Sequence, residues 1–320
     1  MTSSRREFLG ATAGLAAGTF SPYFNSPAHA EEPPAIVDCH THFYDPSRPQ
    51  GVPWPTKDDE VLYRTVLPKQ FLEQAAPCGV MRTVVVEASP WVEDNAWLLD
   101  LAATNPAIIG VVGHLSPGTP DFAAHLERFA ANRLYRGIRV DQSTLRHGQD
   151  RPEFIADIRR LADHGLELDV NGGPDVLPDV SRLAEKMPSL RIVINHLANT
   201  DVDGGPAPQH WLAGMRSAAK HPHVFCKVSA LVEHAKPKGN DKKVPNDVAF
   251  YRPVLDAIWD TFGDDRLIYG SDWPVSDRFA PYSTLFSIMN QYVYARGRVA
   301  AEKFFATNAA IAYALPQTRA

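Results

Sequence analysis

Short apolar runs recur at regular intervals along the chain. Each run spans six to nine residues, is rich in Val, Ile and Leu, and is nearly continuous in hydrophobicity. Continuous rather than alternating hydrophobicity is typical of strands that are covered on both faces. The pattern predicts eight buried strands, at residues 36–43, 82–89, 108–115, 135–140, 166–171, 191–197, 224–231 and 267–275.

The segments between these runs have helical spacing. Phe154, Ile158 and Leu161, for example, recur every three or four positions and would share one face of a helix. Strands that alternate with helices eight times in about 290 residues predict a (β/α)8 TIM barrel, a fold of typically about 250 residues. The alternative is an open doubly wound sheet, but the chain contains neither a G-x-G-x-x-G after a strand nor a P-loop. Helices are expected at 71–76, 97–102, 122–129, 154–161, 180–187, 211–218, 254–259, 286–294 and 300–315.

Three long connections follow predicted strands, at 44–68, 199–209 and 233–247. In a TIM barrel they leave the carboxyl ends of the strands, where barrel enzymes place their active sites. Long connections in a compact domain are usually functional or disordered. Trp54 and the prolines of the first connection favour an ordered flap over the site, whereas the Lys- and Gly-rich composition of the third indicates mobility.

The N-terminus has the three parts of a twin-arginine signal peptide. Arg5 and Arg6 precede an apolar run at 10–20, and Ala28-His29-Ala30 has the small-x-small pattern of a cleavage site. We therefore expect residues 1–30 to direct export to the periplasm and residues 31–320 to form one barrel domain. The apolar run is too short for a stable membrane span.

Composition excludes several other classes of protein. The net charge is −5 and no block of basic residues occurs, which argues against binding to nucleic acid or to a membrane surface. The three cysteines include no Cys-x-x-Cys, which argues against a zinc ribbon or a disulfide framework. A small-molecule substrate is expected, and the oligomeric state is left open.

The first predicted strand ends in a His-x-His pair. Side chains alternate along a strand, so His40 and His42 should share one face at the carboxyl end of the barrel. A second pair, His221 and His223, precedes the seventh strand and therefore belongs at the opposite end, where we expect a surface position. Position in the fold, and not the motif alone, distinguishes the two pairs.

The other predicted strands also end in polar or charged residues. Such groups are costly to bury in apolar surroundings unless they are paired or bind a metal. Their convergence at one end of a barrel predicts a shared reaction centre. The residues are Glu87, His114, Arg139, Asp141, Asp169, Asn171, His196, Lys227, Ser229 and Asp272.

The residue types in this group indicate hydrolytic chemistry. His40, His42, His196 and Asp272 are the kinds of ligand that zinc or a similar divalent ion prefers. A bound ion would lower the pKa of water to about 7 and polarise a carbonyl group. Asp272 would accept the proton of the attacking water and later deliver it to the leaving oxygen.

A second set of residues is predicted to bind the substrate. Arg139 and Lys227 would hold an anionic or polyhydroxylated molecule, or stabilise a developing oxyanion. His114, Asn171 and Trp54 are expected to complete the substrate-binding wall.

At these residues the chain resembles a known family. "DCHTHF", "INHLA" and "YGSDWPVS" are similar to the amidohydrolase superfamily, in its amidohydrolase-2 branch. "YRGIRV", "CKVSAL" and "LIYGSDWPV" resemble TIM-barrel hydrolases that include L-fuconolactonase, L-rhamnono-lactonase and 2-pyrone-4,6-dicarboxylate lactonase. The resemblance runs from about Ile36 to the end of the chain. It implies a lactone hydrolase in which His40, His42, His196 and Asp272 are catalytic and Asp272 is the base.

The chain departs from the superfamily pattern at the fifth strand. Many members place a metal-binding Lys or His there, whereas this chain has Asp169 and Asn171. A binuclear centre is therefore not expected. The resemblance implies one divalent ion, with zinc as the first choice and Glu87 as an additional ligand. Catalysis without a metal, as in the pyrone dicarboxylate lactonase branch, stays open.

Two other functions compete with lactone hydrolysis. A metal-dependent decarboxylase of the same superfamily usually keeps a His on the fifth strand, which is missing here. A periplasmic binding protein on an inactive barrel would be expected to lose the proton-handling Asp, yet Asp272 is present.

Overall fold

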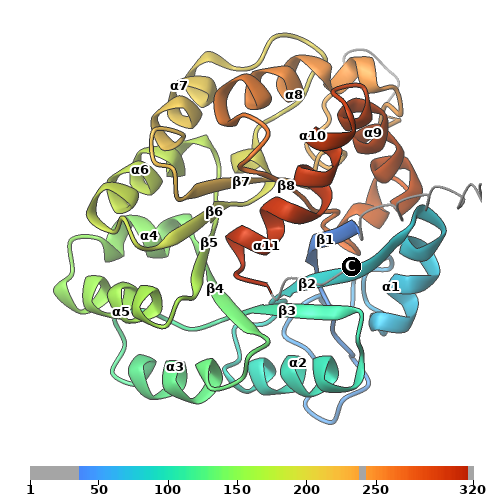
Figure 1. Cartoon of the computed structure of the whole chain (residues 1–320). Coiled ribbons are helices and arrows are strands. Elements are labelled where there is room, and N and C mark those ends of the chain that lie inside the picture. Colours follow the sequence, from blue (N-terminus) through green and yellow to red (C-terminus); the bar gives the residue numbers. More distant parts are fainter. Residues whose placement is uncertain (1–35, 238–242, 316–320) are drawn as a thin grey trace, which may run out of the picture. The chain divides into compact units, whose positions relative to one another are not determined.

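Eight parallel strands pair around a barrel in the order in which the chain forms them, in a computed structural model that describes residues 36–237 and 243–315. The described residues belong to one compact unit. The predicted TIM barrel is confirmed (Figure 1). The predicted signal peptide at 1–30 lies outside the described residues. The strands are β1 (Ile36–Thr41), β2 (Val80–Val86), β3 (Ile108–Gly113), β4 (Tyr135–Asp141), β5 (Glu167–Asn171), β6 (Arg191–Ile194), β7 (Val224–Val228) and β8 (Leu267–Tyr269).

Several strands end earlier than hydrophobicity alone predicts. β8 ends at Tyr269, although the predicted strand extends to Val275. The reason is a change of backbone conformation, because Asp272 has a φ of 62° and leaves the extended conformation. β6 and β7 likewise end at Ile194 and Val228, before left-handed residues.

The helices cover the outside of the barrel (Figure 1). α5 is typical: Pro152 is compatible with the first helical turn, and Phe154, Ile158 and Leu161 are buried on one face. The short helix α4 was not predicted; Asp141 caps it by accepting a hydrogen bond from the backbone N–H of Thr144. The helices are α1 (Pro68–Ala75), α2 (Glu93–Thr104), α3 (Phe122–Ala130), α4 (Gln142–Gly148), α5 (Pro152–Asp163), α6 (Leu177–Lys186), α7 (Gln209–Ala218), α8 (Val248–Phe262), α9 (Tyr282–Tyr294), α10 (Arg298–Glu302) and α11 (Asn308–Ala312).

The amino-terminal end of the barrel is covered by α11, which lies across the ring of strands in Figure 1. Ala309, Ala312 and Tyr313 pack against apolar side chains of the barrel interior. Asn308 Nδ2 donates to the carbonyl oxygen of Leu267, at the start of β8, over 2.8 Å. The chemistry is thereby confined to the opposite end.

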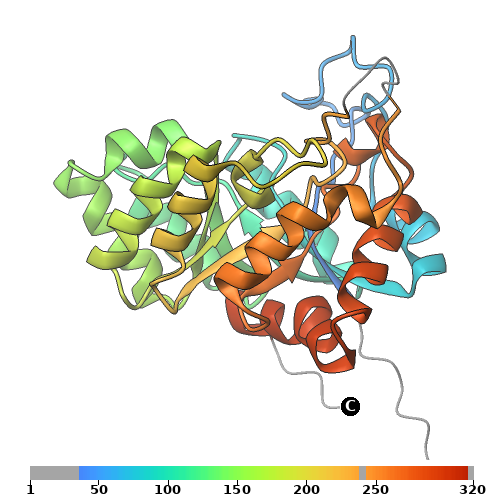
Figure 2. The ribbon, with the colours of Figure 1, turned by 90° about the horizontal axis from the view of Figure 1, so that it is seen from above.

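The first long connection lies at that opposite end. Figure 2 shows residues 44–67, in blue, on the other side of the strands from the red C-terminal helix. Tyr44 and Val66 exchange backbone hydrogen bonds of 2.9 Å in each direction, which closes the base of the connection. These contacts agree with the prediction that the first connection forms an ordered flap. Residues 238–242, in the third connection, lie outside the described residues.

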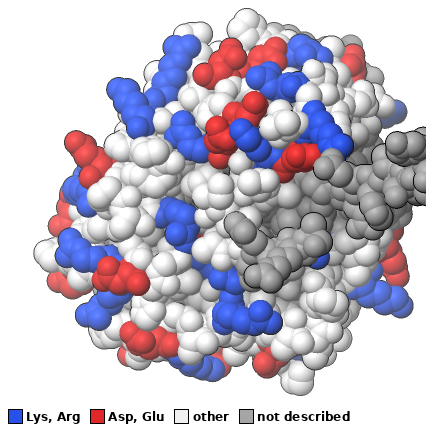
Figure 3. Space-filling view, viewed as in Figure 1, with Lys and Arg blue, Asp and Glu red and all other residues white. Residues whose placement is uncertain are grey.

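Charged side chains of both signs are interspersed on the face seen in Figure 3, outside the area covered by grey atoms. This arrangement fits the moderate net charge of −5. Within residues 36–237 and 243–315, no helix combines the length and apolar character that a bilayer span requires.

The barrel closes between β1 and the segment that follows β8. The backbone N–H of Asp272 donates to the carbonyl oxygen of His40, and that of His42 to Trp273, each over 2.9 Å. The fully buried carboxylate of Asp38 joins the same two segments. Its Oδ1 accepts from the backbone N–H of Ser271 at 2.9 Å and of His40 at 3.1 Å.

A third donor anchors Asp38 to the outer helices, because the hydroxyl of Tyr282 in α9 donates to Oδ2 at 3.0 Å. Burial raises the pKa of Asp38 to about 6, and these hydrogen bonds oppose that shift. Asp38 was not singled out in the sequence, because its partners come from distant parts of the chain.

We predict that Asp38→Ala weakens the closure of the barrel. Three buried donors would lose their acceptor, and each unsatisfied donor costs about 1–3 kcal/mol. The free energy of unfolding in urea should fall by at least about 3 kcal/mol. Tyr282→Phe, which removes only one donor, should cost about 1 kcal/mol. Equal losses of unfolding free energy in the two variants would contradict this role of Asp38 in barrel closure.

Candidate active site

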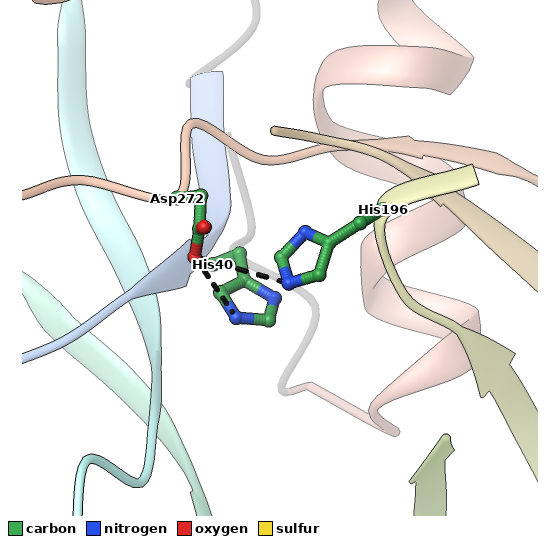
Figure 4. A group of neighbouring side chains, drawn as sticks. All are labelled: His40, His196 and Asp272. Atoms are coloured by element: carbon green, nitrogen blue, oxygen red, sulfur yellow. Dashed lines mark ion pairs between the residues drawn. The ribbon is translucent and has the colours of Figure 1, made fainter. Parts of the chain in front are cut away.

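One carboxylate oxygen is the focus of the site. Oδ1 of Asp272 lies 3.2 Å from His42 Nε2, 3.4 Å from His40 Nε2 and 3.9 Å from His196 Nε2. All four side chains are buried. Figure 4 shows the rings of His40 and His196 directed toward the carboxylate from different strand ends. The structure thus brings together the four residues predicted to be catalytic.

The second nitrogen of each histidine has its own partner. His42 Nδ1 lies 3.0 Å from the carbonyl oxygen of Val86, at the end of β2. His196 Nδ1 lies 2.8 Å from the hydroxyl of Ser229, just after β7. These contacts fix the orientation of the rings, as outer partners do for histidines in catalytic and metal sites.

The backbone at three neighbouring strand ends is left-handed. Residues His196 to Asn199, which follow β6, have φ values between 46° and 53°, and Ala230 and Asp272 have φ values of 53° and 62°. Each such residue costs roughly 1–2 kcal/mol relative to the right-handed conformation. Trp211 helps to hold the first turn, because its indole N–H donates to the carbonyl oxygen of Leu197 at 2.7 Å. Strain of this kind concentrates at functional sites.

Burial and mutual contact set the charges of the cluster. Burial would raise the pKa of Asp272, but His196 and His42 outweigh it and lower the pKa to about 2. Burial lowers the pKa of His196 to about 3, and burial together with Lys227 lowers that of His40 well below its usual range. At neutral pH the site therefore holds an ionised carboxylate facing neutral imidazoles at His40 and His196.

Glu233 is a site residue that sequence reasoning missed. It follows β7 and was read only as the start of the third long connection. Burial together with the charge of the neighbouring Asp272 raises the pKa of its carboxyl group to about 10. Glu233 is therefore protonated at neutral pH and adds no second negative charge beside Asp272. The available signal was its place as the first acidic residue after β7.

A pocket of about 600 Å³ opens above the cluster. Trp54 from the first connection lies over His42, with ring centroids 6.0 Å apart. The predicted substrate-binding residues Arg139, His114 and Asn171 also line the pocket.

Glu87 and Arg139 form a pair in the pocket wall. Arg139 Nε donates to Glu87 Oε1 at 2.8 Å, and Arg139 Nη2 donates to the Glu87 carbonyl oxygen at 2.9 Å. Glu87 is therefore engaged with Arg139, and it is not part of the group of potential metal ligands found among the described residues. The structure gives no support to its predicted role as an additional ligand.

Lys227 does not lie where a substrate-binding residue was expected. Its side chain is completely buried beneath the cluster, and it is not among the described residues that line the pocket. Nζ contacts Asp169 Oδ2 at 2.7 Å and His40 Nδ1 at 3.1 Å. The prediction treated the carboxyl half of β7 as part of the rim, whereas Lys227 points into the closed interior of the barrel.

The other His-x-His pair is separate from the site. His221 and His223 precede β7 and are half-buried, and His223 Nε2 lies 3.2 Å from the carbonyl oxygen of Ala184. Neither residue lines the pocket.

The donor set fits a divalent ion by type and spacing. His40, His196 and Asp272 each offer a ligand atom, and these atoms lie within 4.8 Å of one another. His40 Nε2 is buried and makes no hydrogen bond of good geometry. Two imidazoles and one carboxylate are ligands that zinc accepts.

Comparisons with known proteins identify the family. The amidohydrolase family model matches residues 37–315. The L-fucono-1,5-lactonase of Burkholderia ambifaria is 34% identical over 242 residues, which cover 75% of this chain and 80% of that protein. The L-fucono-1,5-lactonase of Burkholderia multivorans is 30% identical over 289 residues, which cover 88% of this chain and 96% of that protein.

Solved structures show the same fold. An amidohydrolase from Burkholderia multivorans with bound HEPES has a TM-score of 0.78 and 26% identity, and covers 88% of this chain and 100% of its own. A second crystal form with bound zinc has a TM-score of 0.75, 28% identity and the same coverage. A probable 2-pyrone-4,6-dicarboxylic acid hydrolase from Acinetobacter baumannii, at 16% identity and a TM-score of 0.66, supports the fold alone; it covers 88% of this chain and 99% of its own.

We predict that Gly270→Ala disrupts the site more than the fold. A Cβ at this position would lie 2.9 Å from His40 Cβ, 3.1 Å from Ser229 Cβ and 3.3 Å from Lys227 Cγ. Overpacking of this kind typically costs about 1–3 kcal/mol. We expect a folded protein by circular dichroism, with displaced imidazole NMR signals. Gly173→Ala, whose Cβ would meet only one atom at 4.0 Å, is the control. Unchanged imidazole signals in Gly270→Ala would contradict the close packing.

Proposed function

This chain belongs to the amidohydrolase family, and within it we propose that the chain hydrolyses a neutral sugar lactone to the open-chain aldonic acid. Family membership confirms the prediction of a hydrolase. The proposal rests on the ionised Asp272, which lies with three histidines at the base of an open pocket. Two relatives named L-fucono-1,5-lactonase support a lactone as the substrate class.

The proposed reaction begins with proton transfer to Asp272. Asp272 accepts a proton from water while the water oxygen adds to the lactone carbonyl carbon. The tetrahedral intermediate then collapses, the bond between the acyl carbon and the ring oxygen breaks, and Asp272 returns the proton to that oxygen. The products are a carboxylic acid and a hydroxyl group on one open chain. General acid–base catalysis of this type contributes typically about 10²–10⁴-fold.

Neighbouring groups prepare Asp272 for this role. His42 and His196 lower its pKa, which keeps it ionised and ready to accept a proton at neutral pH. The raised pKa of Glu233 keeps that carboxyl group neutral, so Asp272 is the charged member of the two. Arg139 faces the pocket from β4 and would bind the carbonyl oxygen as negative charge develops on it.

The residues that would hold a divalent ion are His40, His196 and Asp272. When bound, such an ion would polarise the lactone carbonyl and acidify water.

The charge of the pocket favours a neutral substrate. Among the described lining residues, Arg139 is the single side chain with a fixed positive charge, and it is already paired with Glu87. Asp141 and Asp272 add carboxylates to the same surface. A dicarboxylated lactone would meet repulsion here, whereas the hydroxyl groups of a sugar can pair with these oxygens and with Asn171.

We predict that the purified protein releases acid from neutral aldonolactones such as L-fucono-1,5-lactone, followed in a pH-stat. The value of kcat/KM for 2-pyrone-4,6-dicarboxylate should be at least about 100-fold lower, because uncompensated charge in a pocket costs several kcal/mol. Asp272→Asn should lower kcat by about 10²–10⁴-fold while the protein still binds the lactone.

Asp265→Asn is the matched control, because Asp265 pairs with Lys303 on the outside and should leave kcat unchanged. If no lactone is hydrolysed and an aromatic acid releases CO₂ instead, the protein is a decarboxylase and the proposal is wrong. Binding of the lactone with no turnover in the wild-type protein would favour a binding protein.

We also propose that the protein is exported to the periplasm by the twin-arginine pathway. The support is the order of Arg5-Arg6, an apolar run and a small-x-small cleavage pattern. Replacing both arginines by lysine should leave the precursor in the cytoplasm, as measured by fractionation and immunoblotting. Replacing Arg133 by lysine, in the mature part of the chain, is the control. Equal periplasmic amounts of the two proteins would refute export by this route.

A further inference from the structure

We propose that Lys227 is a positioning residue that fixes the proton of His40 on Nε2 and so weakens the binding of a divalent ion at that nitrogen. The proposal adds to the proposed hydrolysis a role for a buried residue that cannot touch the substrate. It depends on that function only for its effect on turnover.

The geometry around Lys227 leaves it few partners. Its side chain is completely buried, and it forms an ion pair with the equally buried Asp169 at 2.7 Å. Its other hydrogen-bond contact is His40 Nδ1 at 3.1 Å. The hydroxyl of Tyr313, beyond the end of α11, donates to the second oxygen of Asp169 at 3.1 Å and holds the pair in place.

The chemistry of the ammonium group decides the direction of the contact with His40. An ammonium has three donors and no acceptor, so Nδ1 of His40 must accept. A neutral imidazole that accepts at Nδ1 carries its proton on Nε2. That proton faces Asp272 Oδ1 at 3.4 Å. This contact is electrostatic, because its geometry does not make a hydrogen bond.

His42 is set in the opposite way. Its Nδ1 faces the carbonyl oxygen of Val86 at 3.0 Å, and a carbonyl can only accept. His42 must therefore carry a proton on Nδ1. The two histidines of the His-x-His motif therefore differ at Nδ1, where His42 donates and His40 accepts.

This arrangement works against a divalent ion at His40. A metal binds the lone pair of a ring nitrogen, and metal-ligating histidines usually donate the other N–H to a carboxylate or carbonyl. His40 meets a cation at that position, and its Nε2 has no free lone pair in this tautomer. A divalent ion would also be repelled by the buried ammonium. Lys227 therefore weakens metal binding to the cluster.

The first test reads the tautomer directly. Protein labelled with ¹⁵N in histidine and freed of metal is examined by long-range ¹H–¹⁵N NMR, with the His40 signals assigned from their loss in His40→Asn. We expect a protonated Nε2 and an unprotonated Nδ1 at His40 in the wild type. A proton on Nδ1 of His40 overturns the proposal. No substrate is used, so this outcome is independent of whether the lactone is the right one.

The second test measures zinc binding by competition with a chromogenic chelator. Lys227→Met should bind Zn²⁺ at least about tenfold more tightly than the wild type, which corresponds to about 1.4 kcal/mol. Lys236→Met, which removes an exposed lysine near Asp201, should not change the affinity. If Lys227→Met does not fold because Asp169 is left buried and unpaired, the double variant Lys227→Met/Asp169→Asn takes its place. Equal zinc affinity in the wild type and in the folded variant overturns the proposal.

Discussion

The closure of the barrel between β1 and the segment after β8 is the constraint on which the site depends. Asp38 accepts backbone hydrogen bonds from both segments, and the backbones of His40 and Asp272 are themselves hydrogen-bonded at 2.9 Å. The imidazole and the carboxylate therefore meet because the strands that carry them are joined. The same feature thus stabilises the fold and aligns its proposed base.

The polar groups inside the barrel differ in their partners according to their depth. At the bottom, Tyr313, Asp169 and Lys227 form a buried chain of contacts that ends at His40. Ionised groups at this depth are tolerated because each is paired, and removal of one partner is strongly destabilising. The pocket above contains few fixed charges, and its one arginine is paired within the wall. Charge below orients the catalytic groups, while the carboxylates above disfavour an anionic substrate.

The sequence was sufficient to predict the barrel, Asp272 and the three histidines that converge on its Oδ1. The continuous apolar runs identified the strands, and the strand ends identified the rim. The direction of Lys227, the pairing of Glu87 with Arg139 and the role of Glu233 could not be predicted. Each depends on how deep a side chain lies along its strand and on which distant partner it meets. Local periodicity gives neither the depth nor the partner, because left-handed residues at His196, Ala230 and Asp272 displace the strand ends.

The outer partners of His40 and His42 determine what their His-x-His motif can do. A His-x-His at the end of the first strand supplies imidazoles, but the group behind each ring decides whether its Nδ1 donates or accepts. In this chain a carbonyl lies behind His42 and an ammonium lies behind His40. The difference has a trace in the sequence, since a lysine within a buried strand, as in "CKVSAL", must find a partner inside the barrel. In barrels of this type, a lysine at that position should accompany weak metal binding at the first histidine.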